Sequence, residues 1–229
     1  MFWIDKWYLI LVVPAMLLGF WAQHKVNSTY RQYAGVYNRR GITAAQAARM
    51  ILDDNGLYHV RVERVAGQLT DHYDPRTGVV NLSDAVYNSA SVASLGVAAH
   101  EVGHAVQHAT GYLPLQIRTA IVPVTQIGSR ISPFLILLGL FFGWEPLVQI
   151  GIIAFALVAL FQQVTLPVEY NASSRALATL SGGMLTADET AGAARVLDAA
   201  ALTYVAALIT SIAQLLRLIL LFGGNRRRD

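Results

Sequence analysis

The chain has no cysteine and few charged residues. Without cysteine it can form neither a disulfide nor a thiolate zinc cluster, so any metal ligand must be a histidine, an aspartate or a glutamate. The net charge of +3 at pH 7 is modest, and the basic residues are scattered except near the C-terminus. This charge pattern predicts no nucleic-acid partner and no acidic substrate.

Long apolar runs, by contrast, are abundant. Hydrophobic residues make up 55% of the sequence, charged residues make up 14%, and the mean hydropathy is +0.45. This composition is too apolar for an ordinary soluble domain and predicts an integral membrane protein, with the lipid bilayer as a partner. The apolar runs cover residues 7–22, 131–144, 147–166 and 202–222. Four such runs predict a multi-pass protein of the cell membrane.

The first run has aromatic residues at both ends, with Trp7 and Tyr8 at its start and Trp21 at its end. Aromatic residues in these positions are typical of a helix anchored at both membrane interfaces. A secretory signal peptide is the alternative, but Phe20-Trp21-Ala22 offers no small-x-small cleavage site. We therefore predict an uncleaved transmembrane anchor over residues 1–22.

Residues 23–118 form the polar part of the chain. An amphipathic helix is predicted for residues 43–52, and strands are predicted for residues 58–65 and 78–82. Residues 71–75, between the strands, are predicted to form a turn. These elements predict a small α+β module.

His72, together with Asp71 and Asp74, could form a metal site within this turn. Aspartates in turns more often accept hydrogen bonds from their own backbone, and that interpretation is favoured here. A stronger metal-binding pattern lies further along the chain.

The pattern His-Glu-x-x-His occurs at residues 100–104, after a small and aliphatic segment. Residues four apart lie on one face of a helix, so the imidazoles of His100 and His104 can bind one metal ion. Glu101 lies about 100° further round the helix, where it could take a proton from a zinc-bound water and pass it to a leaving amine. A chance match is the alternative, but a His-Glu pair in so apolar a helix is costly without a metal. The motif predicts a catalytic zinc site.

His108 continues the series of histidines but is a poor third ligand. On a straight helix its Cα lies about 12 Å along the axis from that of His100 and is rotated about 40° beyond His104. A related motif with three histidines solves this with a glycine turn, but Gln107 and Thr110 stand at the glycine and histidine positions here. The remaining candidates for the third ligand are Glu169, Asp84, Asp188, Glu189 and His72.

The apolar runs at residues 131–144 and 147–166 are joined by a short polar turn and predict a helical hairpin. The first run spans a membrane only if its helix extends back over residues 121–129. That extension puts Arg130 inside the membrane and would mark it as functional. In the alternative, the helix starts near Ser129 and Arg130 snorkels to the interface. The sequence leaves both open.

Three segments resemble a known family. They are A-A-H-E-V-G-H-A-V-Q at residues 98–107, L-T-D-H-Y-D-P at 69–75 and T-L-P-V-E-Y-N-A-S at 165–173. Together they resemble the YugP-type membrane zinc metallopeptidases, and the likeness covers most of the chain. The last segment is also similar to a box in integral-membrane proteases of the prenyl-protease and heat-shock type. The resemblance implies a peptidase with zinc on His100, His104 and Glu169 and with Glu101 as general base.

One position departs from that box, because Ser173 stands where an aspartate would orient a ligand histidine. A serine hydroxyl can accept an N–H hydrogen bond but brings no charge, and Asn171 could share the role. Arg175 lies six residues beyond Glu169 and could stabilise the oxyanion of the reaction. An arginine at the membrane interface is the alternative for Arg175.

The order of the predicted elements along the chain separately supports Glu169 as the third zinc ligand. Pro167 is expected to break the helix of the third run, and the short hairpin before it returns the chain to the membrane face of the two histidines. An unpaired glutamate in apolar surroundings is costly, so a bound cation is the simpler reason for Glu169. Asp188 and Glu189 follow Thr186, and a helix N-terminus explains them better.

The sequence as a whole predicts a mainly α-helical membrane protein with a small α+β zincin-like catalytic module. The predicted parts are an anchor (1–22), the catalytic module (23–118), a transmembrane hairpin (119–168), a helix carrying the third zinc ligand (169–201), and a final span with a basic tail (202–229). The predicted activity is zinc-dependent endoproteolysis of a peptide or membrane protein. A catalytically silent scaffold with a structural zinc site is the alternative. Positive charge near the membrane favours a cytoplasmic active site, although the arginines at 226–228 argue the other way.

Overall fold

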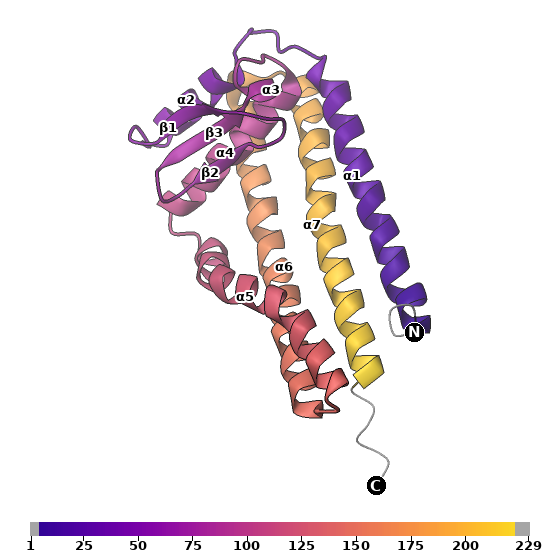
Figure 1. Cartoon of the computed structure of the whole chain (residues 1–229). Coiled ribbons are helices and arrows are strands. Elements are labelled where there is room, and N and C mark those ends of the chain that lie inside the picture. Colours follow the sequence, from indigo (N-terminus) through magenta and orange to yellow (C-terminus); the bar gives the residue numbers. More distant parts are fainter. Residues whose placement is uncertain (1–4, 223–229) are drawn as a thin grey trace. The chain divides into compact units, whose positions relative to one another are not determined.

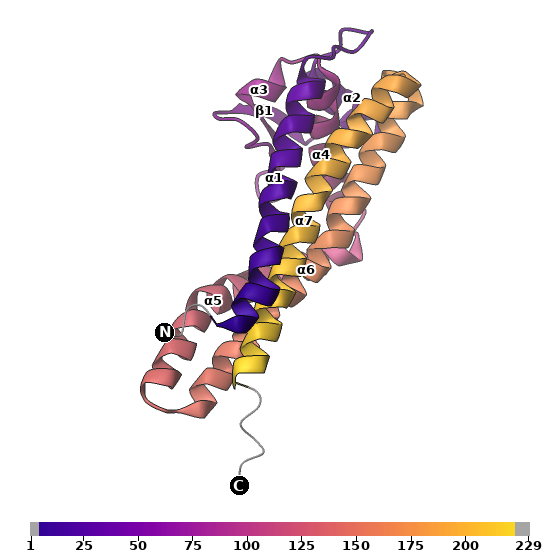
Figure 2. The same cartoon turned by 90° about the vertical axis from the view of Figure 1, so that its right-hand side faces the viewer.

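The computed structural model describes residues 5–222 (Figures 1 and 2). The chain falls into two compact units. Unit 1 comprises residues 1–22, 117–166 and 202–229, and unit 2 comprises residues 23–116 and 167–201. The predicted basic tail at 226–228 lies outside the described residues.

Unit 1 is built from long apolar helices. A π-helical start at Tyr8–Val12 leads into α1 (Val13–Ala34), and the others are α5 (Leu113–Phe141), α6 (Glu145–Thr179) and α7 (Ala187–Phe222). Within the described residues, four helices are long and apolar enough to cross a membrane. In unit 1 they expose large apolar side chains, among them Phe20, Phe134 and Phe141, and such surfaces suit contact with lipid.

Helix α5 starts earlier than the apolar run predicts. It begins at Leu113, so the alternative in which a helix starts near Ser129 is wrong. Gly111, with a φ of +63°, follows the end of the preceding helix and lets the chain turn. Pro114 lies in the first turn of α5, where its missing N–H would have no helical partner anyway. Arg130 therefore lies in the middle of α5, with an exposed side chain.

Helices α5 and α6 are joined by a short turn (Figure 2), and small residues let them pack closely beside it. Ser132 Oγ donates a hydrogen bond to the carbonyl oxygen of Gly151, at 2.7 Å. A Cβ atom on Gly151 would lie 3.1 Å from the backbone nitrogen of Ile136, and one on Gly139 would lie 2.8 Å from that of Val148. A larger residue at Gly139 would force the two backbones apart.

An ion pair holds Arg217 within unit 1. Its Nη2 lies 2.6 Å from Asp5 Oδ2, and the two side chains are 11% and 20% exposed. The guanidinium also lies over the ring of Tyr8, 5.2 Å from its centroid. A cation in an apolar helix is costly unless it is paired, so this contact explains how α7 carries an arginine.

Unit 2 contains a three-stranded sheet packed against short helices (Figure 1). The strands are β1 (Arg61–Val65), β2 (His72–Asp74) and β3 (Val79–Ser83), and the helices are α2 (Ala44–Asp54), α3 (Asp84–Tyr87) and α4 (Val92–Ala109). The strand order is β1-β3-β2, with β1 parallel and β2 antiparallel to β3. Val80 and Leu82 of the central strand are fully buried in one core with Leu52 and Leu95. The helices and this small sheet confirm the predicted fold class.

Capping boxes mark the starts of two helices. At α2, Thr43 Oγ1 accepts from the backbone N–H of Gln46 (3.3 Å), and Gln46 Oε1 accepts from that of Thr43 (2.9 Å). At α7, Glu189 Oε2 accepts from the backbone N–H of Thr186 (2.8 Å), and Thr186 Oγ1 accepts from that of Glu189 (3.4 Å). The second box confirms that Glu189 serves a helix N-terminus.

The segment at residues 71–75 is only partly a turn. His72–Asp74 forms β2, in which Tyr73 pairs with Val80, so the turn predicted for these three residues is wrong. They are extended because β3 has a second edge that needs backbone hydrogen bonds. The chain reverses after Asp74, whose carboxylate accepts from the backbone N–H of Arg76 and the hydroxyl of Thr77, both at 2.9 Å. Asp74 thus has the capping role that was favoured for it.

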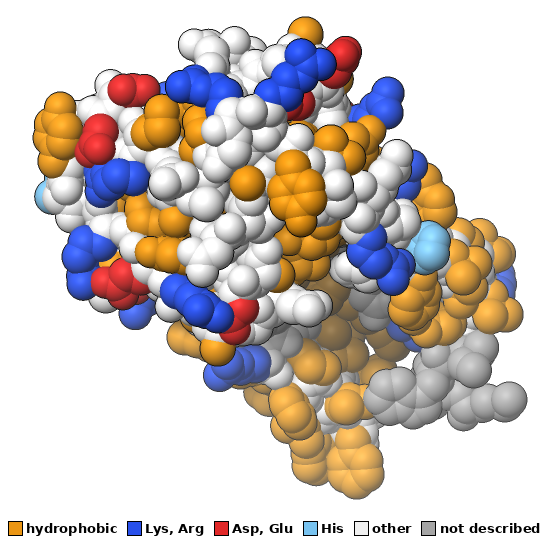
Figure 3. All heavy atoms as spheres, turned by 90° about the horizontal axis from the view of Figure 1, so that it is seen from above, with side chains coloured by type: hydrophobic (Ala, Val, Ile, Leu, Met, Phe, Trp, Pro, Cys, Tyr) orange, Lys and Arg blue, Asp and Glu red, His pale blue; other side chains and the backbone are white. Residues whose placement is uncertain are grey.

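Charged side chains of both signs are interspersed on the face shown in Figure 3. On the sheet, Arg61 pairs with Glu63 and Arg64 pairs with Asp84. The hydrogen bond from Arg64 holds the pKa of Asp84 below its ordinary value. Asp84 therefore has a partner already and is not needed as a metal ligand.

Candidate metal centre

Helix α4 presents the His-Glu-x-x-His motif. Ser91 precedes the helix, and its hydroxyl accepts from the backbone N–H of Ser94 (3.1 Å), which satisfies one of the free N–H groups of the first turn. The histidines follow at four-residue spacing, so their rings lie on one face of α4. The ring centroids of His100 and His104 are 4.7 Å apart, with the rings nearly perpendicular. Helical periodicity alone thus pairs the two imidazoles.

Helix α6 brings Glu169 against this face. Gly103 permits the approach, because a Cβ atom there would lie only 2.7 Å from the carbonyl oxygen of Ala172. Glu169 Oε2 lies 3.2 Å from Nε2 of His100 and 3.6 Å from Nε2 of His104, and the glutamate side chain is 3% exposed. The two histidines therefore meet a buried carboxylate.

Pro167 lies inside α6 and does not end it, so the expected helix break is wrong. A proline within a helix removes one backbone hydrogen bond and distorts the turn before it. Contacts with α4 compensate, because Val168 and Ala172 are fully buried and the carbonyl oxygen of Val168 accepts a hydrogen bond from Gln107 (2.8 Å). Packing against α4 therefore keeps this part of α6 helical despite the proline.

The three side chains fit a zinc ion by the chemistry and direction of their donor atoms. One ligand atom from each of His100, His104 and Glu169 lies within 4.8 Å of the others, and no other such group occurs within residues 5–222. Two imidazole nitrogens and one carboxylate oxygen are the protein ligands of many catalytic zinc sites. Burial would lower the pKa of His104, but the carboxylates of Glu169 and Glu101 outweigh it and raise that pKa above its ordinary value. The site therefore favours a positive charge.

The outer nitrogens of both rings are also engaged. His100 Nδ1 lies 3.0 Å from Ser173 Oγ, and His104 Nδ1 lies 3.0 Å from Gln107 Oε1. These contacts turn both Nε2 atoms toward Glu169. Ser173 thus contacts a candidate ligand from the position of the expected aspartate, whereas Asn171 contacts neither histidine directly but accepts from Gln107 (3.0 Å).

Glu101 is not part of this group of three side chains. Its Oε2 accepts a hydrogen bond from the backbone N–H of Tyr73, at 3.0 Å. Strand β2 lies at the edge of the sheet, and this N–H points to Glu101 and not into the β3 ladder. The carboxylate therefore lies at the free edge of β2, next to His100 in sequence.

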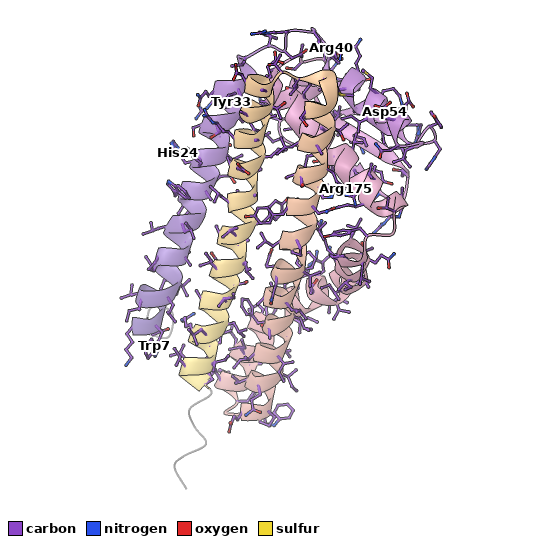
Figure 4. The ribbon with its side chains drawn as sticks, turned by 180° about the vertical axis from the view of Figure 1, so that it is seen from behind. Trp7, His24, Tyr33, Arg40, Asp54 and Arg175 are labelled. Carbon is purple, nitrogen blue, oxygen red and sulfur yellow. The ribbon has the colours of Figure 1, made fainter. Side chains whose placement is uncertain are left out.

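Arg175 is on α6 (Figure 4), and its hydrogen bond goes to Asn171, which is not one of the three candidate ligands. Its Nε donates to Asn171 Oδ1 at 2.8 Å. The side chain also lines a cavity of about 150 Å³ beside Ala99 and Gly103. The oxyanion role suggested for Arg175 stays a prediction.

The other candidates for the third ligand are engaged elsewhere or exposed. Glu189 accepts from the backbone N–H of Arg39 (2.8 Å) in addition to its capping role. His72 Nδ1 lies 2.8 Å from the carbonyl oxygen of Thr70, and Asp188 is exposed in the first turn of α7. His108 lies beyond the motif, with its Nδ1 3.1 Å from the Tyr73 hydroxyl.

Sequence reasoning missed the importance of Gln107 and Tyr73. From the sequence, Gln107 was used only to exclude a motif with three histidines. In the structure it is fully buried and contacts His104. A usable signal was present, because a glutamine three residues after His104 lies one helical turn away within an apolar segment. For the backbone N–H of Tyr73 no comparable signal exists.

The fold and this site define a membrane protein with the zinc-binding arrangement of a metallopeptidase. The chain belongs to the family described as "Putative neutral zinc metallopeptidase", whose model matches residues 8–223. It is 47% identical over 220 residues to the "Putative membrane protease YugP" of Bacillus subtilis (strain 168), a match that covers 96% of this chain and 98% of that protein. No solved structure matches the chain. These findings confirm the predicted resemblance to the YugP-type family and zinc as its metal.

Proposed function

We propose that the chain is a membrane-embedded zinc endopeptidase, with His100, His104 and Glu169 as zinc ligands and Glu101 as general base. The observation that carries this proposal is the convergence of two imidazole Nε2 atoms on one buried carboxylate, 3.2 and 3.6 Å away. The family membership supports the reaction class, because its description names a zinc metallopeptidase.

Three residues of the chain hold the metal in this proposal, and a fourth, Glu101, transfers a proton. When bound, zinc supplies Lewis acidity, which makes a coordinated water more acidic and polarises a carbonyl oxygen. Three protein ligands leave a coordination position open for such chemistry. Glu101 is not one of the three candidate ligands, so its carboxylate is available to accept a proton and return it to the leaving amine nitrogen.

Strand β2 offers a way to position a substrate beside Glu101. An extended peptide would pair with this edge strand through backbone hydrogen bonds and would take the outward N–H of Tyr73 from Glu101. The peptide backbone would then lie next to the released carboxylate of the general base. A peptide or membrane-protein segment in extended conformation is therefore the substrate class we propose.

Metal content is the direct test of this proposal. The full chain, purified in detergent, should bind one zinc per molecule, and treatment with a chelator should abolish cleavage of an unfolded protein substrate. Added zinc should restore cleavage, whereas His104→Ala should fail to retain the metal because it removes one of three ligands. Full cleavage by the metal-free protein would contradict the proposal.

We also propose that the active site faces the cytoplasm, from the distribution of charge near the membrane. If the four predicted spans all cross the membrane, the predicted catalytic module and Glu169 share one side of it and the two ends of the chain share the other. Basic residues near the membrane are more numerous on the predicted catalytic side (Lys25, Arg31, Arg39, Arg40, Arg118 and Arg175) than on the side of the chain ends (Lys6 and the arginines at 226–228). A reporter fused after Asp229 should report an extracytoplasmic C-terminus. One inserted in the exposed loop at residues 66–69 should give the opposite result, and a cytoplasmic C-terminus would overturn the assignment.

A further inference from the structure

A chain of polar side chains leads from His104 to Arg175 through the contact between α4 and α6. Gln107 Oε1 lies 3.0 Å from His104 Nδ1. Gln107 Nε2 donates to the carbonyl oxygen of Val168 (2.8 Å) and to Asn171 Oδ1 (3.0 Å). Arg175 Nε donates to the same Asn171 oxygen (2.8 Å). Gln107 is fully buried, so all of its hydrogen bonds must come from these partners.

Counting donors and acceptors leaves one possible arrangement of hydrogen bonds between His104 and Arg175. A carboxamide nitrogen has two N–H groups, and both of those of Gln107 face oxygens, which fixes which end of its amide is the oxygen. Gln107 Oε1 can only accept, so His104 Nδ1 must carry the proton. In the neutral imidazole, His104 Nε2 then carries the lone pair, directed toward Glu169 and available to a metal ion.

Asn171 stands at the centre of the arrangement. An amide oxygen has two lone pairs, and both are used here, by Gln107 and by Arg175. The donor from Arg175 is charged, so this hydrogen bond is stronger than one between neutral groups. Among the described residues Arg175 forms no ion pair, which leaves its charge to act on Asn171.

We propose that Gln107, Asn171 and Arg175 form a positioning relay that holds the His104 ring with its Nδ1 protonated and its Nε2 aimed at the metal. Arg175 is the charged end of this relay and acts through Asn171 and Gln107, not on the substrate. The inference rests on the proposed function in one respect, because it takes His104 as a zinc ligand.

The second histidine lacks an equivalent arrangement. His100 Nδ1 faces only the hydroxyl of Ser173, and a hydroxyl can donate as well as accept. Ser173 therefore does not by itself dictate the protonation of His100. The relay gives His104 the more rigid orientation, so the metal site should depend more on Asn171 than on Ser173.

The test measures zinc affinity of the full chain in detergent, by competition with a chelating dye, together with the visible spectrum of the cobalt-loaded protein. Asn171→Leu and Arg175→Met should each weaken zinc binding, by up to the roughly 10–100-fold typical of partners that orient a metal ligand. Both should also shift the cobalt bands, because the His104 ring loses its fixed direction. Asn171→Asp keeps an oxygen acceptor for both donors and should retain wild-type affinity and spectrum. Ser174→Ala, on an exposed neighbour in α6, is the matched control.

Different outcomes separate the relay from its alternatives. Wild-type affinity and an unchanged cobalt spectrum in both Asn171→Leu and Arg175→Met would overturn the relay. If Arg175→Met lowers kcat alone and leaves affinity and spectrum unchanged, Arg175 acts on the oxyanion and the relay is again overturned. If Asn171→Leu fails to fold, Arg175→Met decides, since its side chain is only partly buried. Zinc binding that does not depend on His104 would instead overturn the proposed function itself, and the relay with it.

Discussion

Glu101→Gln should leave zinc bound and reduce proteolysis by at least the roughly 10²–10⁴-fold that general acid–base catalysis contributes. The substitution preserves shape, and the amide oxygen of glutamine can still accept the hydrogen bond that Tyr73 donates at 3.0 Å. What is lost is the ability to take a proton and return it to the leaving amine. Zinc content, thermal unfolding and cleavage of an unfolded protein substrate, measured on one detergent preparation, provide the test.

This variant also separates an enzyme from a silent scaffold. A protein that keeps zinc only to hold its helices together should tolerate Glu101→Gln but not the loss of either histidine. Glu63→Gln, at an exposed glutamate of β1, is a matched control that changes the same chemical group without affecting cleavage. A Glu101→Gln protein with wild-type activity would refute the role of Glu101.

Helical periodicity explains why the core of the candidate site could be predicted. The four-residue spacing of His100 and His104 requires only that the segment be helical, and α4 extends well beyond both. The amphipathic pattern at residues 43–52 likewise predicted α2, whose bounds are Ala44–Asp54. Features that depend on local spacing within one element were therefore predictable.

Boundaries set by packing between elements were not predictable in the same way. Pro167 has the local properties of a helix breaker, yet α6 continues through it because the next turns are buried against α4. Residues 72–74 look like part of a turn, but they pair with β3, whose need for a second neighbour no local pattern expresses.

The partners of the site side chains come from distant parts of the sequence. Gln107 bonds to atoms 61 and 64 residues away, and Glu101 bonds to a backbone N–H 28 residues away. A helical pattern shows which face of α4 is polar, but not which element covers that face. The partners of Gln107 on α6 and the placement of Arg175 therefore required the tertiary structure.

Glu169→Gln should weaken zinc binding by more than the roughly 10–100-fold typical of losing a residue that only orients a ligand. Glu169 Oε2 faces the Nε2 atoms of both histidines, at 3.2 and 3.6 Å, and a neutral amide oxygen is a much poorer partner for a divalent cation. Cleavage should fall in parallel, because fewer molecules hold the metal. Zinc affinity is measured by competition with a chelating dye, and thermal unfolding of the metal-free protein shows whether the variant is folded.

Two further variants make this result specific to Glu169. Asp188→Asn removes an exposed carboxylate that was an alternative third ligand, and it should leave zinc affinity unchanged. Ser173→Ala removes the hydroxyl beside His100 Nδ1, and its effect should stay within the range for orienting residues. The order of the three effects carries the argument, since a ligand must exceed an orienting residue, and both must exceed an exposed carboxylate. If Glu169→Gln keeps wild-type zinc affinity and full activity, Glu169 is not a ligand, and the buried carboxylate needs another explanation.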